Sequence, residues 1–108
     1  MTESVPPKQR RYPRASSAKN MFVAWKSPSR TSISRISVVG LGGMFIHEAD
    51  PPPPGTLLQL LFETPVGQVR ARAAVRSAEV GRGMGVEFMQ MRQQERARLA
   101  NMIKHLLP

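Results

Sequence analysis

Short apolar stretches, separated by glycine and proline, recur along most of the chain. The clearest of them, residues 68–75, carries alanine or valine at every second position and arginine at two of the positions between. This period of two is typical of a strand with one buried face and one solvent-facing face. The same combination of apolar runs and turn residues predicts strands at residues 18–26, 30–39, 41–46, 56–63, 68–75 and 84–89.

Residues 30–39 alternate less regularly than the other predicted strands. Their apolar positions, Ile33, Ile36 and Val38, are expected to face the interior, while the arginines and serines between them face solvent. Three glycines follow this strand: Gly40, Gly42 and Gly43.

Such a glycine cluster predicts a tight turn between two strands. Glycine either adopts positive φ angles there or lets another chain or a ligand lie against the backbone. A short glycine motif is weak on its own, because an ordinary hairpin turn explains it.

The period changes after residue 90. Leu99, Met102, Ile103 and Leu106 lie at positions i, i+3, i+4 and i+7, which predicts an amphipathic helix. The charged residues of this segment, Arg92, Glu95, Arg98 and Lys104, are expected largely away from this apolar face. We expect the helix to close one end of a barrel.

Strands at short spacing followed by one helix predict a mainly β fold, a small antiparallel β-barrel or roll. The chain has 108 residues, which is the size of one domain. We expect a tail, a basic arm, the barrel and the helix, at residues 1–7, 8–17, 18–90 and 91–107.

Charge points to a polyanionic partner. The formal net charge is +9 at pH 7, and 12 of the 16 cationic residues are arginine. The planar guanidinium group suits two-pronged binding of phosphates and of guanine edges. A nucleic acid, a nucleotide or a membrane surface would therefore fit, although a soluble protein can also simply be basic.

The densest cluster of charge precedes the first strand. Lys8, Arg10, Arg11 and Arg14 place four cations within seven residues, and Pro13 disfavours a regular helix there. This composition predicts an extended basic arm. It would serve as a ligand-binding segment, a non-specific nucleic-acid arm or a solvated tail.

Several classes of function are not expected. Cysteine is absent, which excludes a disulfide scaffold, a thiol nucleophile and a thiolate metal site. His47 and His105 lie far apart, and we find neither clustered carboxylates nor a nucleophile with a base, so we expect no enzyme and no metal. No apolar run reaches the roughly 18 residues of a membrane helix, and no signal peptide opens the chain. A cytoplasmic location is therefore expected.

Together these features resemble the PilZ domain family. The resemblance rests on Arg10-x-x-x-Arg14 before the first strand, the glycine turn followed by MFI from Met44, and GMGVEF from Gly83 before the helix. It covers residues 8–106. It implies a six-stranded antiparallel β-barrel with a C-terminal α-helix, a bacterial origin, and binding of the second messenger cyclic di-GMP.

The resemblance also implies a ligand site. In the family, an Arg-x-x-x-Arg motif on the N-terminal arm wraps the ligand, and a second motif, (Asp/Asn)-x-Ser-x-x-Gly, lines the barrel surface opposite. Arg10 and Arg14 match the first motif, and Arg11 is a third candidate. Gly43 matches the final glycine of the second motif, and the other two glycines of the turn would let the ligand approach the barrel.

The second motif departs from the family pattern. Counting back from Gly43 puts Val38 at the Asp/Asn position and Gly40 at the Ser position. A shift by one residue brings Ser37 and Gly42 into register but leaves valine at the Ser position. Each lost hydrogen bond costs about 1–3 kcal/mol, so two losses would weaken binding by roughly 10²- to 10⁴-fold.

Two functions therefore compete. In the preferred one, the protein is a cyclic di-GMP receptor that acts on an unidentified downstream protein. In the alternative, it is a PilZ-like adaptor that works through protein contacts without the nucleotide. Nucleic-acid binding is less favoured, because Tyr12, Trp25 and the phenylalanines are too scattered to form a base-stacking platform.

Overall fold

The computed structural model describes residues 14–16 and 21–106, the first segment by its backbone alone. Seven strands precede one helix. They are β1 (Arg14–Ser16), β2 (Phe22–Lys26), β3 (Thr31–Gly40), β4 (Gly43–His47), β5 (Leu57–Thr64), β6 (Gly67–Glu79), β7 (Gly83–Gln90) and α1 (Gln93–Leu106).

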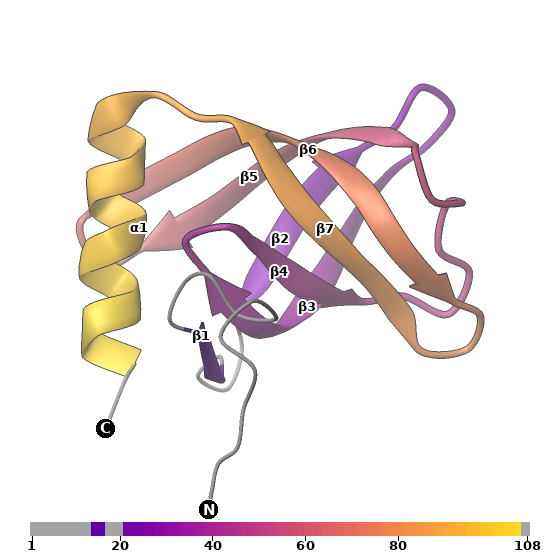
Figure 1. Ribbon diagram of the computed structural model, residues 1–108, viewed down its shortest axis with the longest axis horizontal. Helices are drawn as coiled ribbons and strands as arrows, with labels where there is room; N and C mark the ends of the chain where they lie inside the picture. The colour runs from indigo at the N-terminus through magenta and orange to yellow at the C-terminus, as the bar shows by residue number, and fades with distance from the viewer. Residues whose placement is uncertain (1–13, 17–20, 107–108) are drawn as a thin grey trace, which may run out of the picture.

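Six of these strands close into an antiparallel barrel. The order is β3-β2-β5-β6-β7-β4, and pairing of β3 with β4 completes the ring (Figure 1). The predicted six-stranded barrel with a C-terminal helix is confirmed. The short strand β1 is an addition, because it lies outside the ring and pairs with the end of β3.

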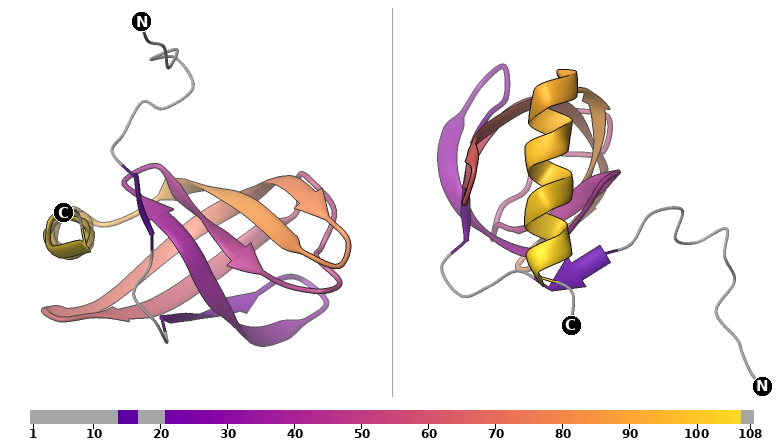
Figure 2. Two further views of the ribbon diagram at one scale, coloured as in Figure 1. Left: turned by 90° about the horizontal axis from the view of Figure 1, so that it is seen from below. Right: turned by 90° about the vertical axis from the view of Figure 1, so that its left-hand side faces the viewer.

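Helix α1 lies across one open end of the barrel, as Figure 2 shows. Leu99, Met102 and Ile103 are buried, and Leu106 packs partly against the same core. Burial of this apolar face confirms the predicted amphipathic helix, although the helix begins at Gln93.

Strand β6 shows the alternation that its sequence predicts. Val69, Ala71, Ala73 and Val75 are all buried, whereas the arginines between them are exposed. The strand continues beyond the predicted segment, to Glu79. These inward residues meet those of the other strands in one core, as expected for a closed barrel.

The predicted facing of β3 is correct at Ile36 but wrong at Ile33 and at Val38, which is half-buried while Val39 enters the core. Ile33 is 72% exposed, and Ser34 is buried instead. The indole Nε1 of Trp25 donates a hydrogen bond to the Ser34 hydroxyl, at 2.9 Å, inside the barrel. A buried Trp N–H needs a partner, so β3 turns its serine inward and leaves Ile33 on the outer surface.

The predicted exposure of Glu95 is also wrong. Its side chain is buried, and its Oε1 accepts a hydrogen bond from the backbone N–H of Arg70. The pairing of β6 with β7 ends where Arg72 meets Gln90, so β6 continues past its neighbour. There α1 supplies the missing partners, because Arg98 Nη1 also donates to the Gln68 carbonyl, at 2.9 Å.

Replacement of Glu95 by alanine is therefore expected to destabilise the barrel by about 1–3 kcal/mol, since a buried N–H loses its charged acceptor. Chemical denaturation measures this change. Its control is Gln94→Ala, at an exposed neighbour on the same helix. Equal stability of the two variants would show that α1 closes the barrel without this hydrogen bond.

Candidate functional site

Three residues of the basic arm, Arg14–Ser16, form a strand that pairs with the barrel. Strand β1 pairs antiparallel with β3, with Arg14 opposite Gly40 and Ser16 opposite Val38. Of Arg14 only the backbone is described, and Arg10 and Arg11 lie outside the described residues. The backbone of Arg14, the second arginine of the Arg-x-x-x-Arg motif, thus lies directly beside Gly40, the first glycine of the turn.

The glycine turn is held by close approach rather than by positive φ angles. Positive φ occurs at four other glycines of the described chain, and not at Gly40, Gly42 or Gly43. A Cβ at Gly43 would overlap the carbonyl oxygen of Val86 on β7. The Gly42 carbonyl accepts a hydrogen bond from the Phe88 N–H, at 2.8 Å. Of the two explanations predicted for these glycines, close approach of another strand holds at Gly43.

The second half of β3 presents side chains to the outside beside β1. Ile36 and Val39 are fully buried, whereas Ser37 and Val38 are half-buried and Arg35 is exposed. The pairing with β4 shifts register between Ile36 and Val38. Such a bulge re-aims side chains, and here two consecutive residues avoid the core.

The family's second motif also fits residues 35–40 in a third register. Ser37 and Gly40 then take the Ser and Gly positions, and Arg35 replaces Asp or Asn. Counting back from Gly43 missed this register. The pairing of Arg14 with Gly40 is the structural signal for it, because it brings the ends of the two motifs side by side.

A second surface feature lies at the N-terminal end of α1. An open groove of about 820 Å³ runs over the outer faces of β2, β5 and β6 to the first turns of the helix. We define the basic groove by its cationic lining residues, Lys26, Arg70, Arg72, Arg92 and Arg98.

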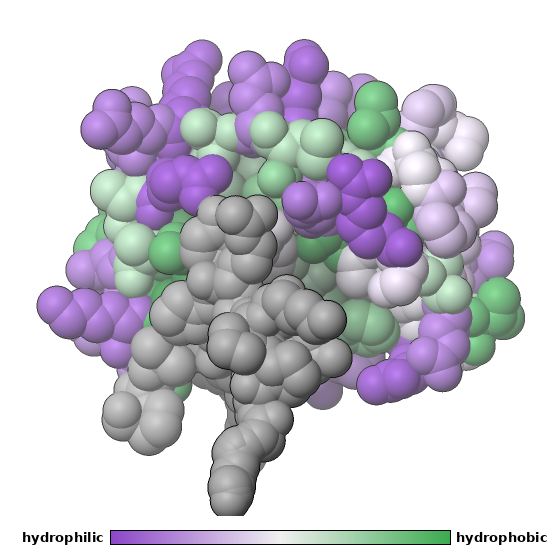
Figure 3. Space-filling view, in the orientation of Figure 1, coloured by the Kyte–Doolittle hydropathy of each residue, from purple (hydrophilic) through white to green (hydrophobic). Residues whose placement is uncertain are grey.

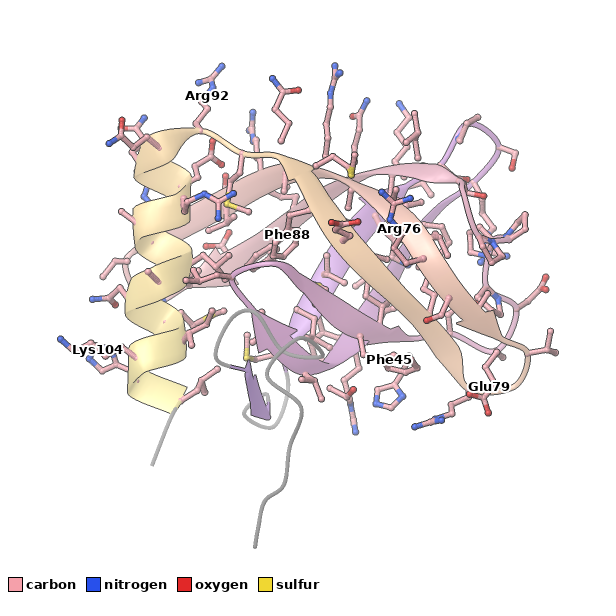
Figure 4. The ribbon with its side chains drawn as sticks, in the orientation of Figure 1. Phe45, Arg76, Glu79, Phe88, Arg92 and Lys104 are labelled. Carbon is pink, nitrogen blue, oxygen red and sulfur yellow. The ribbon has the colours of Figure 1, made fainter. Side chains whose placement is uncertain are left out.

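The two features sit at opposite ends of the helix. Figure 4 shows Arg92 projecting outward before the first turn of α1 and Lys104 at the far end. In the same orientation, Figure 3 shows hydrophilic side chains gathered along the upper edge, where Arg92 stands. Strand β1 lies towards the C-terminal end of α1 in Figure 1.

Metal-binding clusters and membrane-spanning helices are absent from the described part of the chain. The described part of the chain holds no group of three or more His, Asp or Glu side chains placed to bind a metal. Within residues 14–16 and 21–106, no helix has the length and apolar character that crossing a membrane requires.

Comparison with known families identifies the barrel. The model of the PilZ domain matches residues 8–105 of the chain. The chain belongs to the PilZ family. The match begins before the two arginines of the arm and ends inside α1, so this PilZ domain includes the arm, the barrel and the helix.

Solved structures share the fold. The PilZ domain with c-di-GMP of YcgR from Escherichia coli superposes with a TM-score of 0.74 at 18% identity, over 91% of each chain. The Bacillus subtilis inhibitor of motility, MotI/DgrA, gives a TM-score of 0.73 at 21% identity. That match covers 89% of this chain and 50% of MotI, so the chain spans half of that protein. No curated protein sequence matches the chain.

Proposed function

We propose that this PilZ domain binds cyclic di-GMP between its N-terminal arm and the outer face of β3, and signals to a downstream protein. The pairing of β1 with β3 carries the proposal, because it places Arg14–Ser16, the described part of the arm, against the second half of β3. The solved YcgR domain, which shares the fold, contains this nucleotide. We propose a receptor and adaptor of the bacterial cytoplasm, without catalytic activity.

The arm supplies the positive charge in this proposal. Arg10 and Arg14 bind the phosphates and the guanine edges of the ligand, with Arg11 assisting. A guanidinium group can donate two parallel hydrogen bonds to a phosphate or to guanine O6 and N7. The glycines of the turn, Gly40 and Gly42 above all, leave space for the ligand beside the barrel.

Strand β3 supplies the second half of the site. We propose the register in which Ser37 and Gly40 hold their family positions, so Arg35 alone departs. Arg35 donates hydrogen bonds where Asp or Asn would accept them, and it would therefore bind the O6 and N7 edge of a guanine. One lost hydrogen bond costs about 1–3 kcal/mol, so we expect binding roughly 10- to 100-fold weaker than with an intact motif.

Titration calorimetry with cyclic di-GMP, repeated with GMP and at raised salt, tests the proposal. We expect micromolar or tighter binding that is selective over GMP. Absence of binding at high protein concentration, confirmed by NMR titration, would contradict it and favour the adaptor that works without the nucleotide. The presence of Arg35 where the family motif has Asp or Asn is the observation that favours this adaptor function.

The register on β3 has its own test. Ser37→Ala is expected to weaken cyclic di-GMP binding by about fivefold, which corresponds to a hydrogen bond worth about 1 kcal/mol. Ser32→Ala, at a half-buried serine of the same strand, is the matched control and should leave the affinity unchanged. If calorimetry finds the same affinity for both variants, the register ending at Gly40 is wrong.

A further inference from the structure

The cations of the basic groove have no carboxylate ion-pair partners among the described residues. The described acidic side chains that form ion pairs do so elsewhere: Arg30 with Glu48 and Asp50, Arg76 with Glu87, and Arg82 with Glu79.

The two remaining acids of the described chain are occupied within the fold. Glu95 lines the groove, but it accepts the backbone N–H of Arg70. Glu63, on the β5–β6 hairpin, accepts a hydrogen bond from Gln68, at 2.9 Å. The groove therefore keeps a concentrated positive charge, and such a surface attracts an anionic partner.

Strand register places an apolar row next to the cations. Ile33, Ala24, Leu61 and Arg70 lie side by side across β3, β2, β5 and β6. Ile33 is 72% exposed, and Ala24 and Leu61 are half-buried and line the groove. The outer face thus joins an apolar strip to positive charge.

The adjacent row is polar. Lys26, Gln59 and Arg72 follow one another across β2, β5 and β6, and Gln90 of β7 completes the row. These side chains lie beside the apolar strip on the same outer face. A partner seated here would therefore meet apolar contacts along one row and cations along the next.

This combination fits a protein segment better than a nucleic acid. Protein interfaces combine apolar contact with arginine, whereas single-stranded nucleic acids need aromatic side chains on which bases stack. The one aromatic residue lining the groove, Trp25, is only 1% exposed. A concave groove also offers a lipid surface less contact than it offers a chain that enters it.

We propose that the basic groove docks an acidic segment of a partner protein that also carries apolar side chains. Acidic side chains of the segment pair with Arg70, Arg72 and Lys26, and its apolar side chains cover Leu61 and Ile33. This surface is separate from the proposed nucleotide site, because that site lies at β1 and the second half of β3. The two sites can be tested independently, since docking requires no nucleotide.

The probe is a synthetic peptide of glutamate and leucine, compared with a peptide in which serine replaces every leucine. NMR titration of the labelled full chain locates each peptide, and fluorescence anisotropy gives its affinity. We expect shifts at the basic groove, and weaker binding of the serine peptide. Shifts located elsewhere, or no binding at low salt, would overturn the proposal.

Matched variants separate the groove from the general charge of the protein. Arg72→Glu reverses a charge in the groove, and Lys104→Glu makes the same change near the far end of α1. We expect Arg72→Glu to weaken binding of the leucine peptide at least about fivefold more than Lys104→Glu does. Ile33→Ser, at an exposed position, should also weaken it.

Two results would contradict the proposal. Equal weakening by Arg72→Glu and Lys104→Glu would show that only net charge matters. Tighter binding of a polyuridine strand or of phosphatidylserine vesicles at the same groove would assign it to a different partner. Calorimetry with cyclic di-GMP on the same variants tests the nucleotide site separately. We expect Arg72→Glu to bind the nucleotide as the unchanged protein does, whether or not the peptide binds.

Discussion

Arg14→Ala is expected to weaken cyclic di-GMP binding at least about tenfold, because a charge-assisted hydrogen bond contributes about 1.5–3 kcal/mol. The strand pairing explains why this position matters. Arg14 lies opposite Gly40 at the end of β3, so its backbone lies beside the proposed second motif. Arg10→Ala should have a comparable effect, and the double variant should abolish measurable binding.

Titration calorimetry of the variants measures the loss, with Lys8→Ala as the control. Lys8 belongs to the same basic arm but lies outside the Arg-x-x-x-Arg motif. It should therefore lower the affinity only through net charge, an effect that raised salt removes. If Arg14→Ala and Lys8→Ala reduce the affinity equally, the arm acts as a general positive charge and the proposed two-pronged contact is wrong.

Gly43→Ala is expected to destabilise the barrel by about 3 kcal/mol, at the upper end of the usual cost of overpacking. The added Cβ would overlap the Val86 carbonyl oxygen and would lie 3.1 Å from the carbonyl carbon. Both atoms belong to the backbone of β7, which the barrel holds in place. The two strands would have to separate where β4 pairs with β7.

Gly85→Ala is the matched control, because Gly85 lies on β7 in the same ladder, opposite Phe45. Its added Cβ would meet the Ser77 hydroxyl oxygen at 2.7 Å, and that side chain can rotate. We expect a cost of at most about 1 kcal/mol, which Ser77→Ala should relieve. Denaturant midpoints compare the two variants. Equal stability would show that β4 and β7 can separate at little cost.

The sequence predicts the fold well where one local rule decides the structure. The alternation of Val69, Ala71, Ala73 and Val75 predicts the buried face of β6, and no other contact overrides it. The helical spacing of the apolar residues predicts the packing of α1 in the same way.

The predictions fail where a distant polar group decides the structure. Ile33 is more apolar than Ser34, yet Ser34 is buried because the Trp25 indole needs an acceptor nine residues away. Glu95 lies four residues before Leu99, so helical spacing puts it on the buried face of α1, where a carboxylate is not expected. It is accommodated there because β6 extends beyond β7 and leaves the N–H of Arg70 without a strand partner. Neither requirement can be read from a local pattern.

Strand pairing decides which of the candidate site residues lie together. The arginines of the arm and the glycines of the turn stand out by composition. Composition does not show which of these glycines belongs to the site, because Gly40, Gly42 and Gly43 look alike in sequence. Pairing with β1 distinguishes Gly40, and packing against β7 gives Gly43 a structural role. The basic groove was missed because its cations come from separate strands and the helix.

An NMR titration of the labelled full chain with cyclic di-GMP tests the central claim most directly. We predict saturable shifts along β3 from Arg35 to Gly40 and in the paired strand β1, with Arg72 in the basic groove unaffected. Shifts confined to the basic groove, or no shifts at millimolar nucleotide, would contradict the claim that the arm and β3 form a cyclic di-GMP site.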